Sequence, residues 1–207
     1  AVTELVNLPE YTARGMEAQR SAVVLLDNEN AKLPLAADTR IFVDGLKPAV
    51  AANYGTVVNT PEEAEVVLLF LNTVFNGNQP AGTDRALDQM MASRFPDTNL
   101  AFNDAILAKA KSYSEASQLV TLVDLNRPAV LTELKDISSA LMGTFGVSDE
   151  AMLDVVFGKH NPVGKLPFEL PSSMAEVEAQ LEDVPDDTAN PLFPYGWGLS
   201  YGSAQSM

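Results

Sequence analysis

A long polar stretch, residues 72–99, directly follows the nearly continuous apolar run 65–71. This stretch contains Asp84, Asp88 and Asp97, with Arg85 beside the first of them. A carboxyl group can act as a general acid or a general base. Loops of this length are usually functional, and in open α/β sheets ligands bind at the carboxyl ends of the strands. The sequence therefore predicts a functional loop at residues 72–99.

One histidine and the absence of cysteine restrict the remaining chemistry. Neither a disulfide nor a thiolate metal site is possible, and His160 cannot by itself complete a zinc site or a conventional triad. For His160, which follows Lys159 in a turn, the alternatives are a contact with an interdomain cleft and exposure to solvent, and we expect exposure. A dinucleotide fingerprint and a phosphate loop are both absent, since Gly164-Lys165 is followed by Leu. The sequence predicts no metal and no cofactor.

The 207 residues carry a net charge of −15, and 46% of them are hydrophobic. This acidity argues against nucleic acids and anionic membranes as partners. No apolar run approaches the roughly 18 residues of a membrane-spanning helix. The acidic residues between Leu181 and Asn190 are expected to solubilise that loop rather than to bind metal.

Apolar segments alternate with helical ones along the chain. Strands are predicted at 41–45, 65–71, 118–124 and 140–146, and helices at 9–22, 48–54, 103–117, 134–138 and 149–157. Such alternation predicts a mostly parallel sheet with helices on both faces, an α/β sandwich of three layers. A further short strand is expected between Pro167 and Pro171. Because proline cannot donate to a strand ladder, we expect this last strand at an edge of the sheet.

Two motifs carry a resemblance to a known family. They are Asn161-Pro162-Val163-Gly164-Lys165-Leu166-Pro167 and Tyr195-Gly196-Trp197-Gly198-Leu199-Ser200-Tyr201. Together they resemble the C-terminal domain of glycoside hydrolase family 3, the β-glucosidase and β-xylosidase family. The resemblance implies a six-stranded sheet between two helical layers. Residues 1–207 would form one domain, with a linker helix at 1–20 and a C-terminal tail at 181–207.

The resemblance also implies how the chemistry is shared. The nucleophilic Asp of such enzymes lies in an N-terminal barrel, within a Ser-Asp-Trp-type motif that this chain lacks. Many relatives supply the acid/base Glu from the loop matched by residues 72–99, which has no Glu here. Asp84 is the local candidate for that role, the alternatives being a cap on the turn at Ala86 or a pair with Arg85. Arg85 is either a sugar contact or a solvated charge. Trp197 either stacks on a sugar ring or packs the tail onto the domain.

Three hypotheses of function follow. The first is the C-terminal domain of a retaining β-glycosidase, which completes the cleft of an N-terminal barrel and acts there on β-linked gluco- or xylo-oligosaccharides. On this hypothesis the isolated chain is inactive. The second is a non-catalytic carbohydrate-binding or scaffolding module of the same fold. The third is a flavodoxin-like small-molecule binder. The resemblance favours a secreted or periplasmic protein over a cytoplasmic one.

Overall fold

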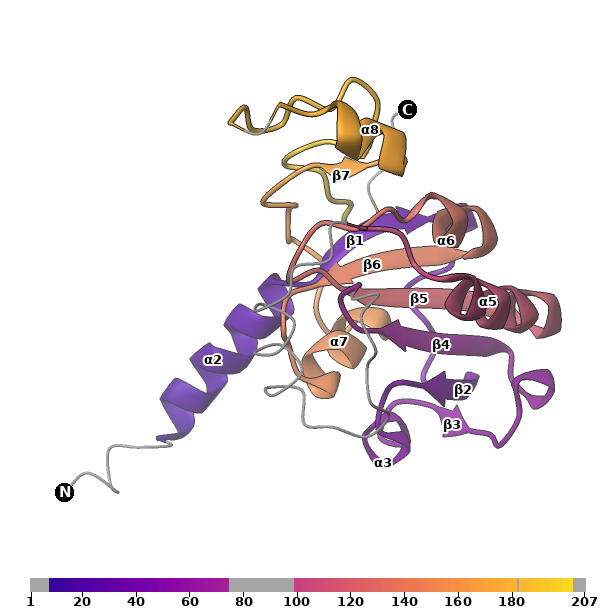
Figure 1. Ribbon diagram of the computed structural model, residues 1–207. Coiled ribbons are helices and arrows are strands. Elements are labelled where there is room, and N and C mark those ends of the chain that lie inside the picture. Colours follow the sequence, from indigo (N-terminus) through magenta and orange to yellow (C-terminus); the bar gives the residue numbers. More distant parts are fainter. Residues whose placement is uncertain (1–7, 75–98, 182, 203–207) are drawn as a thin grey trace.

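A mostly parallel sheet forms the centre of the molecule (Figure 1). The computed structural model describes residues 8–74, 99–181 and 183–202. The strand order is β1-β6-β5-β4-β2-β3. The strands are β1 (Val24–Asn28), β2 (Arg40–Asp44), β3 (Thr56–Val57), β4 (Val66–Leu71), β5 (Gln118–Asp124) and β6 (Ala140–Thr144). Strands β2 to β6 are parallel, and β1 runs antiparallel to β6. The six-stranded, mostly parallel sheet is therefore confirmed.

Helices cover both faces of this sheet. The covering helices are α3 (Pro48–Ala51), α5 (Asp104–Ala116), α6 (Thr132–Ile137) and α7 (Asp149–Val156). Helix α2 (Pro9–Ser21) contacts α7, and α8 (Met174–Ala179) lies beside residues 170–171, outside the main sheet. One apolar core lies between the sheet and helices α3 and α7, and the other lies between the sheet and helices α5 and α6. Every residue of β4 is buried, as its unbroken apolar sequence predicts for a central parallel strand.

Side-chain caps fix the starts of α5 and α7. Ser148 accepts a hydrogen bond from the backbone N–H of Ala151 and so caps α7. Asn103 caps α5 in the same way through the N–H of Ile106. Each cap satisfies one of the N–H groups that a helix leaves without an internal partner at its start. These two caps therefore stabilise the first turns of α5 and α7.

The strand expected between Pro167 and Pro171 takes a different place from the predicted one. It is reduced to β7 (Leu170–Pro171), which pairs with β8 (Pro191–Phe193) in a separate two-stranded sheet. Leu166 exchanges backbone hydrogen bonds with the C-terminal segment instead, through Trp197 O at 2.8 Å and Gly196 N at 3.0 Å. Because the flanking prolines lack N–H donors, the segment cannot continue a long ladder. The edges of the main sheet are β1 and β3.

The strand order reverses direction between β2 and β4. The chain passes from β2 outward to β3, then returns to β4 and continues through β5 to β6 on the other side. Ligands of open α/β sheets bind beyond the carboxyl ends of the strands near such a reversal. Helix α2 leaves the domain on this side of the sheet in Figure 1, and Gln19 near its end accepts a hydrogen bond from Ser148 N. In the described part of the chain, no helix combines the length and apolar character needed to cross a bilayer.

Candidate functional site

A buried carboxylate lies at the carboxyl edge of the sheet. Asp124 ends β5, and its residue is only 3% exposed. Its Oδ2 accepts a hydrogen bond from Asn126 Nδ2 at 2.7 Å, and its Oδ1 accepts one from Gly146 N at 2.9 Å. A buried charge is costly unless it is hydrogen-bonded, and these donors meet that need. The carboxylate thereby joins the connections that follow β5 and β6.

Thr73, two residues beyond β4, completes this arrangement. Its hydroxyl lies 2.8 Å from the backbone O of Asp124 and 3.3 Å from Asp124 Oδ2. A hydroxyl has one hydrogen, so the shorter contact is the main hydrogen bond. The same oxygen accepts from Asn126 N at 3.2 Å. We call Thr73, Asp124, Asn126 and Gly146 the Asp124 cluster, which links the ends of three neighbouring parallel strands.

The connection that follows β5 also contacts Leu100 and Ala101, at the end of the polar stretch 72–99. Val130 N donates to Leu100 O at 2.9 Å, and Ala101 forms an isolated parallel bridge with Val130. Residues 124–130 thus contact Thr73 and Leu100, which are described residues on either side of positions 75–98. The predicted residues Asp84 and Arg85 belong to that segment and lie outside the described residues. Their roles stay predictions.

Trp197 is half-buried and is held by its own domain. Its indole Nε1 donates to Leu26 O at 2.8 Å, and its ring lies 5.9 Å from that of Phe193, centroid to centroid. It packs against the core that also contains helices α5 and α6. These contacts match the packing alternative and leave sugar stacking a prediction. Tyr195, by contrast, is 63% exposed.

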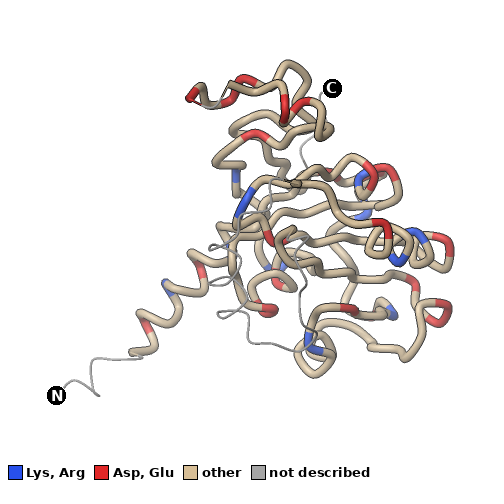
Figure 2. Tube along the Cα trace, in the orientation of Figure 1, with Lys and Arg blue, Asp and Glu red and all other residues tan. Residues whose placement is uncertain are grey.

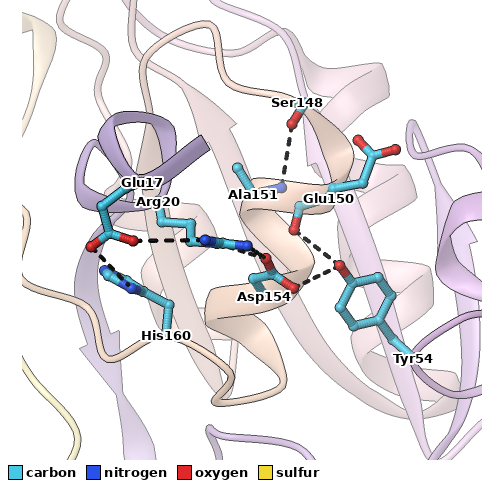
Figure 3. A network of polar contacts seen from close by, with 8 residues as sticks. All are labelled: Glu17, Arg20, Tyr54, Ser148, Glu150, Ala151, Asp154 and His160. Atoms are coloured by element: carbon cyan, nitrogen blue, oxygen red, sulfur yellow. Dashed lines mark hydrogen bonds and ion pairs between the residues drawn. The ribbon is translucent and has the colours of Figure 1, made fainter. Parts of the chain in front are cut away.

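A polar network joins helix α2 to the sandwich (Figure 3). Arg20 of α2 binds the carboxylate of Asp154 on α7, and Tyr54 donates to the other oxygen of the same carboxylate at 2.7 Å. The hydrogen bond with Asp154 raises the pKa of Arg20. Burial, followed by the hydrogen bond to Asp154, raises the pKa of the Tyr54 phenol. Both shifts favour the protonated guanidinium and the protonated phenol, which donate to Asp154. Because Arg20 lies on α2, these contacts attach that helix to the sandwich.

His160 belongs to the same network. Its side chain is only 17% exposed, so the expectation of an exposed turn histidine is wrong. Its Nδ1 lies 3.7 Å from Glu17 Oε1, and Figure 3 shows the ring turned toward α2. The backbone N–H of His160 donates to Asp154 O, which draws the turn after α7 back onto the helix. The residue therefore contacts the linker helix.

Acidic positions are spread over loops and helices of the fold in Figure 2. Among the described residues, no group of three or more His, Cys, Asp or Glu side chains is arranged to hold a metal ion. Within the acidic loop, Asp187 accepts a hydrogen bond from Leu181 N, while the buried Glu169 accepts from Thr188 N at 2.7 Å. These carboxylates fix the loop that connects β7 and β8 by binding backbone N–H groups.

The fold and the polar carboxyl edge define a doubly covered α/β domain with a candidate site at the strand ends. The model of the family described as "Glycosyl hydrolase family 3 C-terminal domain" matches residues 43–201. The chain belongs to this family.

Two relatives illustrate the relationship. "Beta-glucosidase C" of Emericella nidulans is 42% identical over 207 residues, which cover 97% of this chain and 32% of that protein. "Periplasmic beta-glucosidase/beta-xylosidase" of Dickeya chrysanthemi is 36% identical over 202 residues, which cover 96% of this chain and 30% of that protein. The chain thus spans about a third of the length of these curated relatives.

A solved structure has the same fold. The beta-glucosidase from Listeria innocua in complex with glucose superimposes with a TM-score of 0.69 at 20% identity. The match covers 96% of this chain and 35% of that one.

Proposed function

We propose that this chain is the C-terminal domain of a retaining β-glycosidase that hydrolyses β-linked gluco- or xylo-oligosaccharides. The observation that carries the proposal is the 42% identity with a beta-glucosidase across 97% of the chain. Residues 1–207 form one domain, with residues 1–20 as the linker and 181–207 as the tail. The domain closes the substrate cleft of an N-terminal barrel in the same protein.

The division of chemistry follows from what glycoside hydrolysis requires. A retaining enzyme places two carboxyl groups about 5 Å apart, one as nucleophile and one as acid/base. The barrel supplies the nucleophile, because this chain lacks the family's Ser-Asp-Trp-type motif. We propose Asp84 as the acid/base, Arg85 as a contact to sugar hydroxyls, and Trp197 as a stacking surface. The contacts of Thr73 and Leu100 with residues 124–130 at the carboxyl edge support a site on this side of the sheet.

Two relatives with "Periplasmic" in their names support a location outside the cytoplasm for the parent protein. We propose that it is periplasmic or secreted. Detecting the full-length protein in periplasmic or culture-fluid fractions, with a cytoplasmic enzyme as the marker of lysis, tests this. Recovery with the cytoplasmic marker would contradict it.

Activity assays test the main proposal. The full-length protein should release nitrophenol from an aryl β-glucoside or an aryl β-xyloside, while the matching α-glucoside controls for anomeric specificity. The isolated 207-residue chain should be inactive, and the protein that lacks it should lose activity. Full activity without these residues would contradict the proposed role.

The second candidate is a non-catalytic carbohydrate-binding module, favoured by one observation: no Glu occurs between residues 72 and 99. Calorimetric titration of β-linked oligosaccharides into the isolated chain separates the two candidates. Binding by this chain alone, together with an inactive full-length protein, would favour the module.

A further inference from the structure

Helix α2 has little contact with the sandwich apart from its last turn. None of its 13 residues is buried, and residues 9–15 are all exposed. A Cβ on Gly15, near the middle of the helix, would have no atom within 4 Å. An isolated helix of this length is only marginally stable in water. The place of α2 in the structure therefore depends on the side chains that its last turn directs at α7.

Two neighbouring side chains of α2 bind opposite ends of α7. Gln19 Oε1 accepts a hydrogen bond from the backbone N–H of Ser148, the N-cap of α7, at 2.8 Å. Arg20 Nε and Nη2 lie 2.7 Å and 2.6 Å from Oδ2 of Asp154, near the C-terminal end of α7. Successive side chains of a helix point about 100° apart around its axis. Together the two contacts therefore fix the rotation of α2 about its own axis.

The Asp154 carboxylate is the strongest of these attachment points, as Figure 3 shows. Its side chain is only 8% exposed, and it also accepts from the Tyr54 hydroxyl at 2.7 Å. A guanidinium presents Nε and Nη together in a rigid fork, whereas a lysine presents one ammonium. Glu17, one turn earlier on α2, lies 3.7 Å from Arg20 Nη1 and orients the guanidinium from the other side. The contact with Asp154 thus requires an arginine in one orientation.

A pivot lies directly beside these contacts. Helix α2 ends at Ser21 and β1 begins at Val24, so only two residues connect them. The second of these, Val23, is completely buried and belongs to the core beneath α7. Ala22 is therefore the first position at which the backbone can turn once the side-chain contacts of α2 are lost.

We infer that Arg20 and Asp154 are positioning residues, which set the angle at which α2 leaves the sandwich. When the pair is broken, α2 moves as an arm about Ala22 while the sheet and its covering helices stay folded. The sandwich does not depend on α2, because its two cores are built from the strands and from helices α3, α5, α6 and α7.

The consequence for catalysis rests on the proposed function, in which a barrel precedes α2. The angle of α2 then sets how that barrel faces the carboxyl edge of the sheet. Groups that react across two domains must be held in one geometry, and a small displacement lowers the rate without removing any group that touches substrate. Arg20 and Asp154 act on the sugar only through the position of the two domains.

Spin labels measure the angle of the arm directly in the 207-residue chain. The chain contains no cysteine, so Tyr11→Cys on α2 and Lys111→Cys on α5 provide two unique sites, both exposed. Electron–electron resonance should give one narrow distance distribution for the otherwise unchanged chain. Arg20→Ala should broaden it about twofold, because the undocked arm samples many angles. Arg20→Lys keeps the charge without the fork and should give an intermediate width.

Arg14→Ala is the matched control. Arg14 lies on the same helix, is exposed, and makes no ion pair or hydrogen bond with the described residues. Its removal should leave the distribution unchanged. A pair that only stabilised the fold would lower the unfolding temperature of Arg20→Ala without broadening the distances. An unchanged width in Arg20→Ala, or equal broadening in Arg14→Ala, would therefore overturn the inference.

Activity of the full-length protein tests the consequence for catalysis. In Arg20→Ala, kcat/KM for an aryl β-glucoside should fall about tenfold, with partial recovery in Arg20→Lys and no change in Arg14→Ala. Full activity of Arg20→Ala with a broadened distribution would confirm the arm and contradict its role in catalysis. If the wild-type protein hydrolyses no β-glycoside, the proposed function fails while the distance measurements still decide the arm.

Discussion

Arg20 and Asp154, 134 positions apart in the chain, form the ion pair that attaches helix α2 to α7. Arg20 Nε and Nη2 lie 2.7 Å and 2.6 Å from the same carboxylate oxygen. Helix α2 buries no residue, so apolar packing alone holds it weakly. The carboxylate is nearly buried, and Tyr54 shares it, so this pair fixes the direction in which the linker leaves the domain.

The first prediction concerns this pair. Asp154→Ala leaves Arg20 and Tyr54 without their shared acceptor and should lower the free energy of unfolding by about 2–4 kcal/mol. Urea denaturation monitored by circular dichroism measures this loss. The exposed pair of Arg40 and Glu65, at 3.8 Å, provides the control, since Arg40→Ala should cost less than about 1 kcal/mol. Equal losses in the two variants would contradict a special role for Asp154.

The second prediction concerns alkaline pH. Burial, and then the hydrogen bond to Asp44, raises the pKa of Tyr113 to about 12. Because the folded pKa lies above the unfolded one, the stabilisation is complete below about pH 10 and is lost as pH rises toward 12. In that window Tyr113→Phe should make the decline in unfolding free energy shallower by up to about 1.4 kcal/mol per pH unit.

Urea titrations between pH 9 and pH 12 measure that slope. Tyr11→Phe, at a side chain that is 53% exposed, controls for the substitution itself. The prediction fails if both variants follow the wild-type curve.

The third prediction concerns the close contact between the two glycine-containing motifs, residues 161–167 and 195–201. A Cβ on Gly198 would lie 2.3 Å from Gly164 O, far inside van der Waals contact with backbone. Gly198→Ala should therefore destabilise the domain by about 1–3 kcal/mol, because backbone must shift. Gly15, inside helix α2, has no atom within 4 Å of such a Cβ. Gly15→Ala should instead stabilise by about 0.5–1 kcal/mol, and thermal unfolding of both variants tests the contrast.

The strands with unbroken apolar sequence could be predicted because burial on both faces leaves a strong signal. Residues 118–124 form β5 with the predicted bounds, and residues 66–71 of the predicted 65–71 form β4. The edge strand could not be placed, since sequence does not reveal that Leu166 pairs with Trp197 rather than with the main sheet. The sequence indicates Asp124 only as the end of a predicted strand. Its role depends on Thr73 and Gly146, which are distant in sequence and adjacent only in the fold.

The fourth prediction separates packing from sugar stacking at Trp197. Trp197→Phe keeps an aromatic face but loses the hydrogen bond to Leu26 O, so the free energy of unfolding should fall by about 1–3 kcal/mol. If the ring stacks on sugar, KM for an aryl β-glucoside should stay within threefold in Trp197→Phe and rise at least tenfold in Trp197→Leu. Similar KM values in both variants would leave only the packing role.

The fifth prediction tests Asp84 as the acid/base. Asp84→Asn in the full-length protein should lower kcat for a poorly activated β-glucoside by about 10²–10⁴-fold, because proton transfer to the leaving oxygen is lost. An aryl glucoside with an acidic leaving group needs little protonation, so its glycosylation step should suffer much less. Azide should accelerate the variant by replacing the water that needs a general base. Asp88→Asn, four residues further along the same segment, is the matched control and should keep near wild-type rates. Equal effects at both positions, or no rescue by azide, would assign the proton transfer to another residue.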